Sequence, residues 1–312
     1  MTVCIAAIYE HSSIVGASDR LLTAGDVQFE PFASKVRPLT NSITAMTAGD
    51  ADLNAEILGL VAEDVLAELA IDQSWLRVAW VVERYRHHWS ELQRRKAERE
   101  ILKPLGLTTD RFVYEQASMG DKAVQDITNA LIGTRLASVA CIIAGVDDTG
   151  PHIYAIRDGH SQLADAVGFA AIGTGARHAE LQLMQARYGA GFTMTEALAL
   201  VHLAKSRAEV APGVGADTDM FLIGPSPGTY GSVSWEVMHY LRGQADRMRQ
   251  DERTALYAAS DGMRQFLDSM ARPQEAQEAD PDVPDVPEIT DGQDGTGNDS
   301  TPHREDGTDI EH

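Results

Sequence analysis

The sequence has few cysteines, no long apolar run and a deficit of basic residues. Its two cysteines, Cys4 and Cys141, lie in apolar segments, which predicts buried free thiols and fits a reducing compartment such as the cytoplasm. No apolar stretch approaches the roughly 20 residues that a membrane-spanning helix requires. Lysine and arginine number 26 against 47 aspartates and glutamates, for a net charge of −21. We therefore expect a cytoplasmic protein that binds neither membrane nor nucleic acid, since nucleic-acid binding requires a cationic surface.

The acidic charge is concentrated at the end of the chain. Residues 273–312 contain 13 acidic residues and one arginine, together with many prolines and glycines. Such a segment buries too little apolar surface to offset the entropy of ordering, so we predict a disordered acidic tail. Asp291, Asp294 and Asp299 lack the residue order of an EF-hand calcium loop. We expect a main domain over residues 1–235, a helical extension over residues 236–272 and this tail.

Hydrophobic patterning predicts a mixture of strands and helices. The predicted strands are residues 2–7, 14–17, 43–50, 136–146, 152–157, 168–172, 219–223 and 230–235. The predicted helices are residues 53–70, 74–102, 176–187, 194–209 and 235–270, and residues 125–132 form a short helical or irregular connection. This order predicts an α+β fold in which two antiparallel sheets lie between helical layers.

Two motifs that suggest a cofactor or a metal have simpler interpretations. Gly173-Thr174-Gly175 lacks the third glycine and the distant acidic residue of a dinucleotide-binding motif. His87 and His88 are adjacent on a predicted helix and project in different directions, which favours an aromatic packing stripe over a ligand pair. We therefore predict no cofactor and no metal.

Thr2 follows the initiator methionine and opens the first predicted strand. Removal of Met1 ahead of a small residue would leave a threonine with a free α-amine, which is a hydroxyl nucleophile with its own base. The predicted hairpin brings Asp19 back towards Thr2, and a lysine just inside a third strand, Lys35, could lie between them. A neighbouring ammonium lowers the pKa of the amine, and Gly49 leaves room for a backbone N–H to reach an oxyanion.

Each of these residues also has a purely structural interpretation. Asp19 could be a turn residue at a strand end, Lys35 a solvated lysine and Gly49 an ordinary turn glycine. Five motifs follow one another along the chain: Thr2-Val3, Ala17-Ser18-Asp19-Arg20, Ser34-Lys35-Val36, Ala48-Gly49-Asp50-Ala51-Asp52 and Ile172-Gly173-Thr174-Gly175. Their order favours the catalytic interpretation, because it resembles that of proteasome β-subunits and the simpler bacterial proteasome-related ring proteases. The resemblance covers about residues 2–234, weakly between 73 and 137.

The resemblance implies a four-layer αββα sandwich, the N-terminal nucleophile hydrolase fold. It implies that Thr2 is the nucleophile, that Asp19 and Lys35 form the supporting ion pair and that Gly49 serves the oxyanion hole. Thr174 stands where the family has a serine near the amine, and Glu209 stands near the family's auxiliary aspartate. A serine that usually follows that aspartate is replaced by Pro212. The residues that resemble the substrate-pocket positions of the family are Leu22, Ala33, Thr47 and Ala51.

Three functions remain open from the sequence. The first is a threonine peptidase that cleaves unfolded polypeptides inside stacked homo-oligomeric rings, with an ATP-dependent unfoldase as a candidate partner. The second is an amidohydrolase of the same fold that acts on a small amide. The third is a non-catalytic ring or binding subunit. The complete set of catalytic residues favours an enzyme, and the order of motifs favours the peptidase.

Overall fold

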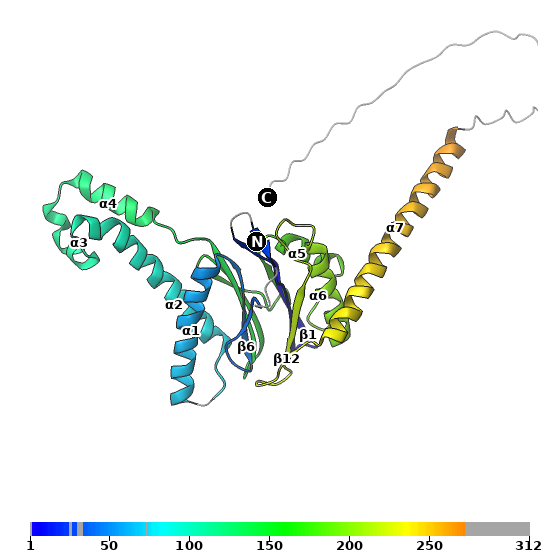
Figure 1. Ribbon diagram of the computed structural model, residues 1–312, viewed down its shortest axis with the longest axis horizontal. Coiled ribbons are helices and arrows are strands. Elements are labelled where there is room, and N and C mark those ends of the chain that lie inside the picture. The colour runs from blue at the N-terminus through cyan, green and yellow to red at the C-terminus, as the bar shows by residue number, and fades with distance from the viewer. Residues whose placement is uncertain (1, 25–26, 30–33, 73, 272–312) are drawn as a thin grey trace, which may run out of the picture. The chain divides into compact units, whose positions relative to one another are not determined.

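The computed structural model describes residues 2–24, 27–29, 34–72 and 74–271. The chain divides into two compact units, residues 1–255 and residues 256–312. Within the described residues it is an α+β protein with two five-stranded antiparallel sheets, a two-stranded ribbon and seven α-helices. Figure 1 shows the two sheets side by side within the first unit. The predicted α+β class is confirmed.

The first sheet has the strand order β10-β1-β2-β11-β12. Its strands are β1 (Cys4–Tyr9), β2 (Ser13–Asp19), β10 (Phe169–Ile172), β11 (Thr218–Ile223) and β12 (Tyr230–Ser232). β1 and β2 are buried along their whole length, which explains why their sequences are apolar or small up to the charged Asp19 at the end of β2. A Cβ on Gly16 would lie 2.2 Å from the ring of Phe221, so the glycine allows that ring to cover β2.

The second sheet has the order β5-β6-β7-β8-β9. Its strands are β5 (Val36–Pro38), β6 (Ile43–Gly49), β7 (Val139–Asp147), β8 (Gly150–Arg157) and β9 (His160–Leu163). The predicted hairpin between β7 and β8 is confirmed, since Asp147 pairs with Gly150 across a two-residue turn. The ribbon of β3 (Leu22–Ala24) and β4 (Val27–Phe29) falls in a stretch where no strand was predicted.

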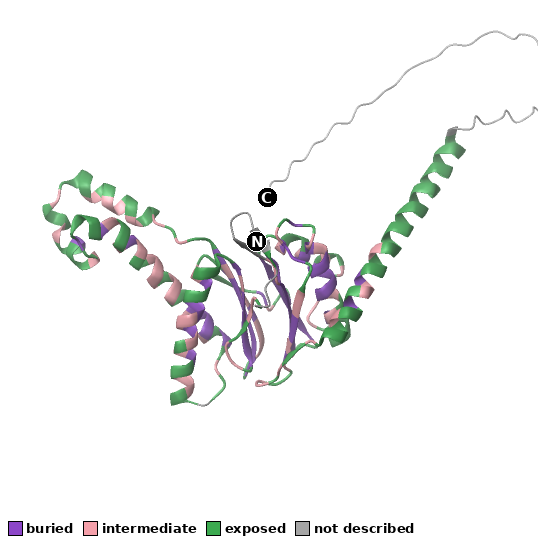
Figure 2. Ribbon diagram, viewed as in Figure 1, coloured by how far each residue is buried: buried purple, intermediate pink, exposed green. Residues whose placement is uncertain are grey.

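Helices cover one face of each sheet. α5 (Ala176–Gln185) and α6 (Met194–Ala208) pack against the first sheet, and α1 (Ala51–Ile71) and α2 (Val78–Ala97) pack against the second. Alternation along β1 divides its side chains between two clusters. Ile5 and Ala7 contact the α5 and α6 side, whereas Cys4, Ala6 and Ile8 join residues of the second sheet. Figure 2 shows the buried residues concentrated in the two sheets, and this arrangement is compatible with a sandwich.

A small helical group follows α2. The predicted helix over residues 74–102 begins later, at Val78, and it continues beyond Ala97, the end of α2, as a π-helical turn (Glu98–Leu102) and a short 3-10 turn (Lys103–Leu105). α3 (Thr109–Glu115) was not predicted, and α4 (Asp121–Gly133) contains the connection predicted near residues 125–132. Their own core is formed by Leu102, Leu107 and Phe112. Figure 1 shows α3 and α4 at the end of α2 that lies away from the sheets.

The predicted amphipathic helix at the end of the domain is α7 (Trp235–Ala271). Leu241 and Ala245 in its first part are buried in the first unit. Residues 256–270 belong to the second unit, where the helix is exposed. No described helix is both long enough and apolar enough to cross a membrane. The predicted acidic tail lies outside the described residues.

Candidate active site

Thr2 lies directly before β1 and is buried, with 2% of its surface exposed. The β1–β2 hairpin pairs Cys4 with Ser18, so Asp19 at the end of β2 reaches the start of β1. The hydroxyl of Thr2 donates a hydrogen bond to Asp19 Oδ1 and accepts one from Lys35 Nζ. The nucleophile predicted from the sequence is therefore held between a carboxylate and an ammonium group.

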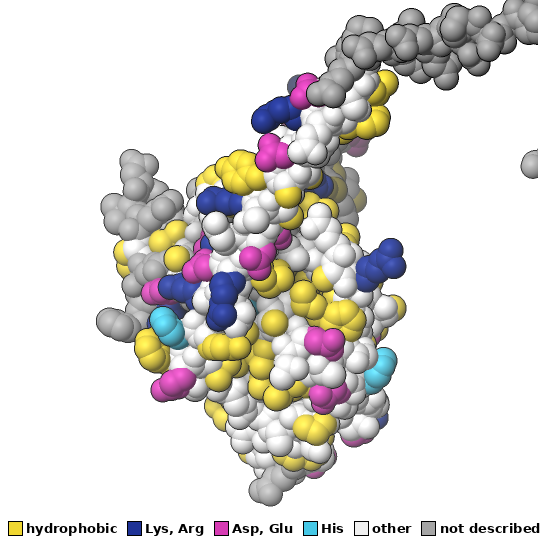
Figure 3. Space-filling view, turned by 90° about the vertical axis from the view of Figure 1, so that its right-hand side faces the viewer, with side chains coloured by type: hydrophobic (Ala, Val, Ile, Leu, Met, Phe, Trp, Pro, Cys, Tyr) yellow, Lys and Arg dark blue, Asp and Glu magenta, His cyan; other side chains and the backbone are white. Residues whose placement is uncertain are grey.

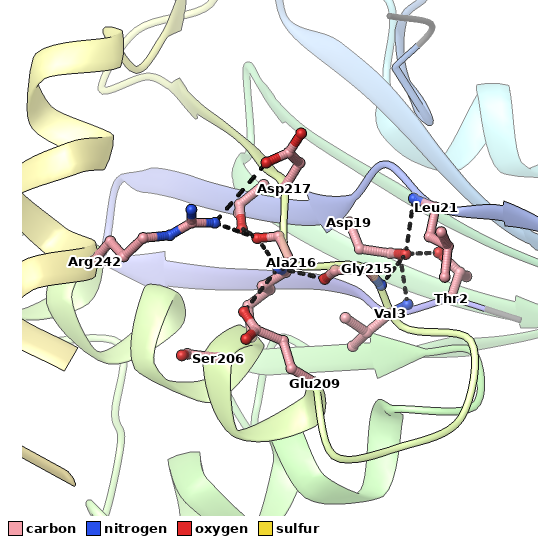
Figure 4. A network of polar contacts seen from close by, with 12 residues as sticks. Thr2, Val3, Asp19, Leu21, Ser206, Glu209, Gly215, Ala216, Asp217 and Arg242 are labelled. Atoms are coloured by element: carbon pink, nitrogen blue, oxygen red, sulfur yellow. Dashed lines mark hydrogen bonds and ion pairs between the residues drawn. The ribbon is translucent and has the colours of Figure 1, made fainter. Parts of the chain in front are cut away.

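Asp19 is fully buried and has several hydrogen-bond donors around it. Its Oδ1 accepts from the backbone N–H of Val3 at 2.9 Å, and its Oδ2 accepts from Gly215 at 3.0 Å and Leu21 at 3.2 Å. Figure 4 shows this carboxylate enclosed by the start of β1 and the segment that precedes β11. A buried carboxylate requires such donors and a countercharge, and these donors leave it little freedom to rotate.

The countercharge is Lys35, whose Nζ lies 2.9 Å from Asp19 Oδ1. The Lys35 side chain is 8% exposed. The lysine was predicted just inside a third strand, but it lies in a bend immediately before β5. Since β5 is an edge strand of the second sheet, the pair joins the two sheets at the nucleophile.

The backbone nitrogen of Thr2 contacts the turn that follows β10. Thr2 N donates to Thr174 Oγ1 at 3.2 Å, and the N–H of Gly175 donates to the Thr2 carbonyl oxygen at 3.2 Å. Gly173 has a φ of 94°, and a Cβ at this position would lie 2.2 Å from the Thr2 carbonyl oxygen. Only glycine fits this close approach, which explains the Gly-x-Gly sequence without a nucleotide.

Gly49 ends β6 with a φ of 93°, and a Cβ there would lie 2.4 Å from the Ser138 carbonyl oxygen. Its strand packs next to β1, because the thiol of Cys4 donates to the Thr47 carbonyl oxygen at 3.4 Å. Thr47 is half-buried and Ala51 is exposed at the first position of α1. Leu22 opens β3, but its side chain is not among those described, and Ala33 lies outside the described residues.

Glu209 has a different location from the other predicted catalytic residues. It caps the C-terminal end of α6 and pairs with Lys205 at 3.0 Å and with Arg249 at 3.9 Å. None of its described contacts is with Thr2 or Thr174. Lys205 was not predicted from the sequence, because a lysine four residues before a glutamate resembles an ordinary exposed helix pair. Its complete burial is visible only in the structure.

The chemical groups around Thr2 limit the mechanism. Its described side-chain partners include a carboxylate, an ammonium, a threonine hydroxyl and the thiol of Cys4, and none of these is an imidazole. Cys4 lies two residues away, but burial raises the pKa of its thiol to about 12, so it stays protonated and unreactive near neutral pH. Both cysteines are free and buried, as predicted. Among the described side chains, no group of three or more metal-binding residues gathers.

A cleft of about 540 Å³ opens next to the chain neighbours of two residues of this cluster. It is lined by Arg20, Ser34 and Val36, which are the chain neighbours of Asp19 and Lys35, and by residues of β11, β12 and the start of α7. Its described lining contains none of Thr2, Asp19 and Lys35, and neither Thr47 nor Ala51. Figure 3 shows acidic, basic and hydrophobic side chains intermingled on one face of the protein.

In comparisons with known proteins, no family model matches the chain and no curated protein is detectably similar to it. The resemblance of the sequence motifs to a family therefore remains a prediction.

Proposed function

We propose that the chain is a threonine peptidase that uses Thr2 as an N-terminal nucleophile. The observation that supports this proposal most is the position of Thr2 Oγ1, which is hydrogen-bonded to both Asp19 Oδ1 and Lys35 Nζ. The Thr2 nitrogen in turn donates a hydrogen bond to the Thr174 hydroxyl. A buried hydroxyl next to an ammonium group is suited to become an alkoxide. The nitrogen beside it becomes the general base once Met1 is removed.

The proposed reaction proceeds through an acyl-enzyme. The neutral α-amine takes the Oγ1 proton as Oγ1 bonds to the carbonyl carbon of the scissile peptide bond. The carbonyl oxygen takes up the negative charge, and we assign its stabilisation to the Gly49 N–H. The C–N bond then breaks, and the ammonium returns its proton to the leaving amine. Water attacks the resulting ester, the amine again accepts and returns a proton, and the Thr2 hydroxyl is restored.

Lys35 and Asp19 have separate roles in this mechanism. The ammonium of Lys35 stabilises negative charge on Oγ1 and favours the neutral form of the nearby amine. Asp19 keeps Lys35 in place through the 2.9 Å ion pair, and its own position is set by backbone donors. Because these groups are already oriented before substrate binds, little reorganisation is needed during the reaction.

We further propose the four-layer αββα arrangement of an N-terminal nucleophile hydrolase. Three core clusters support it: one between the sheets, one under α5 and α6, and one under α1 and α2. We propose a cytoplasmic, stacked homo-oligomeric ring with unfolded polypeptides as substrates. In the first unit, the large apolar side chains that are more than 70% exposed support self-association: Ile71, Tyr114, Val210 and Trp235.

Covalent labelling of Thr2 tests the proposed function. Intact mass should show loss of Met1, and a peptide epoxyketone should form one adduct per chain, on Thr2. Thr2→Ala should abolish both adduct and peptide hydrolysis while keeping the thermal midpoint. Thr254→Ala is a matched control, because Thr254 is exposed on α7. Hydrolysis by Thr2→Ala at the wild-type rate would overturn the mechanism.

A substrate comparison and an assembly measurement complete the test. A peptidase should cleave unfolded proteins and blocked peptides, whereas a small-amide hydrolase should act only on short amides. Electron micrographs should show stacked rings with a central chamber. A monomer that hydrolyses only small amides would favour the amidohydrolase, and the absence of any Thr2-dependent reaction would favour a non-catalytic subunit.

A further inference from the structure

Lys205 is a charged side chain with no exposed surface, on the side of α6 that faces the segment before β11. Burying an ammonium is costly unless its three donors are all used. Lys205 Nζ donates to the Gly215 carbonyl oxygen at 2.7 Å, to the Ala216 carbonyl oxygen at 2.8 Å and to Glu209 Oε1 at 3.0 Å. Every donor therefore has an acceptor, and two of the three acceptors belong to one short backbone segment.

The same backbone segment holds Asp19. The N–H of Gly215 donates to Asp19 Oδ2 at 3.0 Å, while the carbonyl oxygen of Gly215 accepts from Lys205. Arg242 of α7 also donates to the Ala216 carbonyl oxygen, at 2.6 Å. Figure 4 shows Gly215 and Ala216 lying between Asp19 on one side and Glu209 and Arg242 on the other. A continuous series of contacts thus leads from Glu209 and Lys205 through Gly215 to Asp19 and Thr2.

The geometry points to Lys205 as a positioning residue for the proposed hydrolysis. It holds the segment of Gly215 and Ala216 so that the Gly215 amide fixes the second oxygen of Asp19, which in turn orients Lys35 and Thr2. Lys205 touches neither the nucleophile nor the Lys35 ammonium in the described contacts. This inference rests on the proposed function, and it assigns Glu209 the role of counterion to Lys205.

The buried charge of Lys205 has a second effect, on the potential at the site. The Lys205 ammonium lies on the Asp19 side of the residues around Thr2. A positive charge there disfavours protonation of the Thr2 amine. Glu209 opposes it with a negative charge. Burial lowers the pKa of Lys205, and both Glu209 and Asp19 oppose this shift, so Asp19 still favours the charged form of the lysine when Glu209 is replaced. Removal of either residue should therefore change the pH dependence of the reaction, and in opposite directions.

The test compares Lys205→Met with Lys122→Met, a control at an exposed lysine of α4. Reactive sites are first counted by epoxyketone titration of Thr2, and rates of peptide hydrolysis are expressed per titrated site. We expect Lys205→Met to reduce the rate of peptide hydrolysis per titrated site by roughly tenfold to a hundredfold, because small misplacements of catalytic groups have effects of that size. The acid limb of its pH–rate profile should move to higher pH, since a lost cation raises the pKa of the amine. A purely structural role would reduce the number of titrated sites and leave the profile of the remaining sites unchanged.

Two further variants keep the test decisive. Lys205→Gln retains hydrogen-bond donors for the two carbonyl groups without the charge, and it replaces Lys205→Met if that variant does not assemble. It should show the same shift of the acid limb with a smaller loss of rate. Glu209→Gln should move the acid limb to lower pH. A wild-type rate per site with an unmoved profile in the Lys205 variants would overturn the inference. Failure of wild-type Thr2 to react at all would overturn the proposed function instead, so the two failures are distinguishable.

Discussion

Lys35 Nζ lies 2.9 Å from Asp19 Oδ1, and the two residues come from different sheets. Asp19 ends β2 in the first sheet, whereas Lys35 immediately precedes β5 at the edge of the second. The pair is nearly inaccessible to water, so its electrostatic attraction is screened little by solvent. Removal of one partner would leave an uncompensated buried charge. The relative position of the two sheets is thus coupled to the environment of the Thr2 hydroxyl.

Lys35→Ala should reduce kcat/KM for peptide hydrolysis by about a hundredfold or more, because alkoxide stabilisation and control of the amine are lost together. Asp19→Asn should act in the same direction with a smaller effect, since Lys35 remains. Fluorogenic peptide kinetics at fixed pH measure both, with Lys122→Ala as an exposed-lysine control. Near-normal activity of Lys35→Ala would make Lys35 a structural residue only.

Thr174→Ala should lower kcat about fivefold, because the hydrogen bond that the Thr2 nitrogen donates to the Thr174 hydroxyl contributes on the order of 1 kcal/mol. Thr174→Ser keeps the hydroxyl and should restore most of the rate. The measurement is single-turnover acylation of Thr2. Equal losses in the alanine and serine variants would show that the methyl group, and not the hydroxyl, is required.

Gly173→Ala should destabilise the protein by about 1–3 kcal/mol, because the backbone has a φ of 94° and the new Cβ would meet the Thr2 carbonyl oxygen. Gly243→Ala is the matched control, since it lies within α7 with open space around it and should be neutral or stabilising. Urea unfolding monitored by circular dichroism gives both values. Equal stability of the two variants would contradict the described turn.

The buried thiol of Cys4 predicts a loss of stability in alkali. Burial raises its pKa from 9.0 to about 12. Below pH 9 the thiol is protonated in both states, so its contribution is constant. Between pH 9 and 12 the unfolded chain loses the proton and the folded chain keeps it, so the free energy of unfolding falls. Cys4→Ala should lessen this fall in urea titrations from pH 8 to pH 10.5, and an unchanged slope would contradict the burial of the thiol.

The pocket residues proposed from the family resemblance predict a substrate preference. Thr47 and Ala51 carry no charge, and an uncharged pocket gains from burying an apolar side chain but offers no partner for a buried charge. Peptides with leucine, alanine or an aromatic residue before the scissile bond should be cleaved faster than those with lysine, arginine or aspartate. A fluorogenic peptide panel measures this order. A preference for a charged residue would place the pocket elsewhere, for example in the cleft beside Arg20.

The sequence predicted the parts of the site that depend on local pattern. Thr2 and Asp19 belong to one hairpin whose apolar strands are unmistakable, so their proximity follows from chain reversal. Lys205 could not be predicted, because its burial depends on the backbone of Gly215 and Ala216, which come from a later segment. β9 was missed for a related reason. All four of its residues are exposed, so no hydrophobic alternation marks it as a strand.

The β1–β2 hairpin also restricts which changes of chain length the protein can accept. Two hydrogen bonds join Val3 and Asp19. The Val3 N–H donates to the Asp19 carboxylate, and the Asp19 N–H donates to the Val3 carbonyl oxygen. Side chains in a strand alternate between faces, so a shift of one residue would turn Asp19 away from Thr2. A single-residue insertion or deletion that shifted this pairing would therefore separate the carboxylate from the hydroxyl, even with every side chain of the site unaltered.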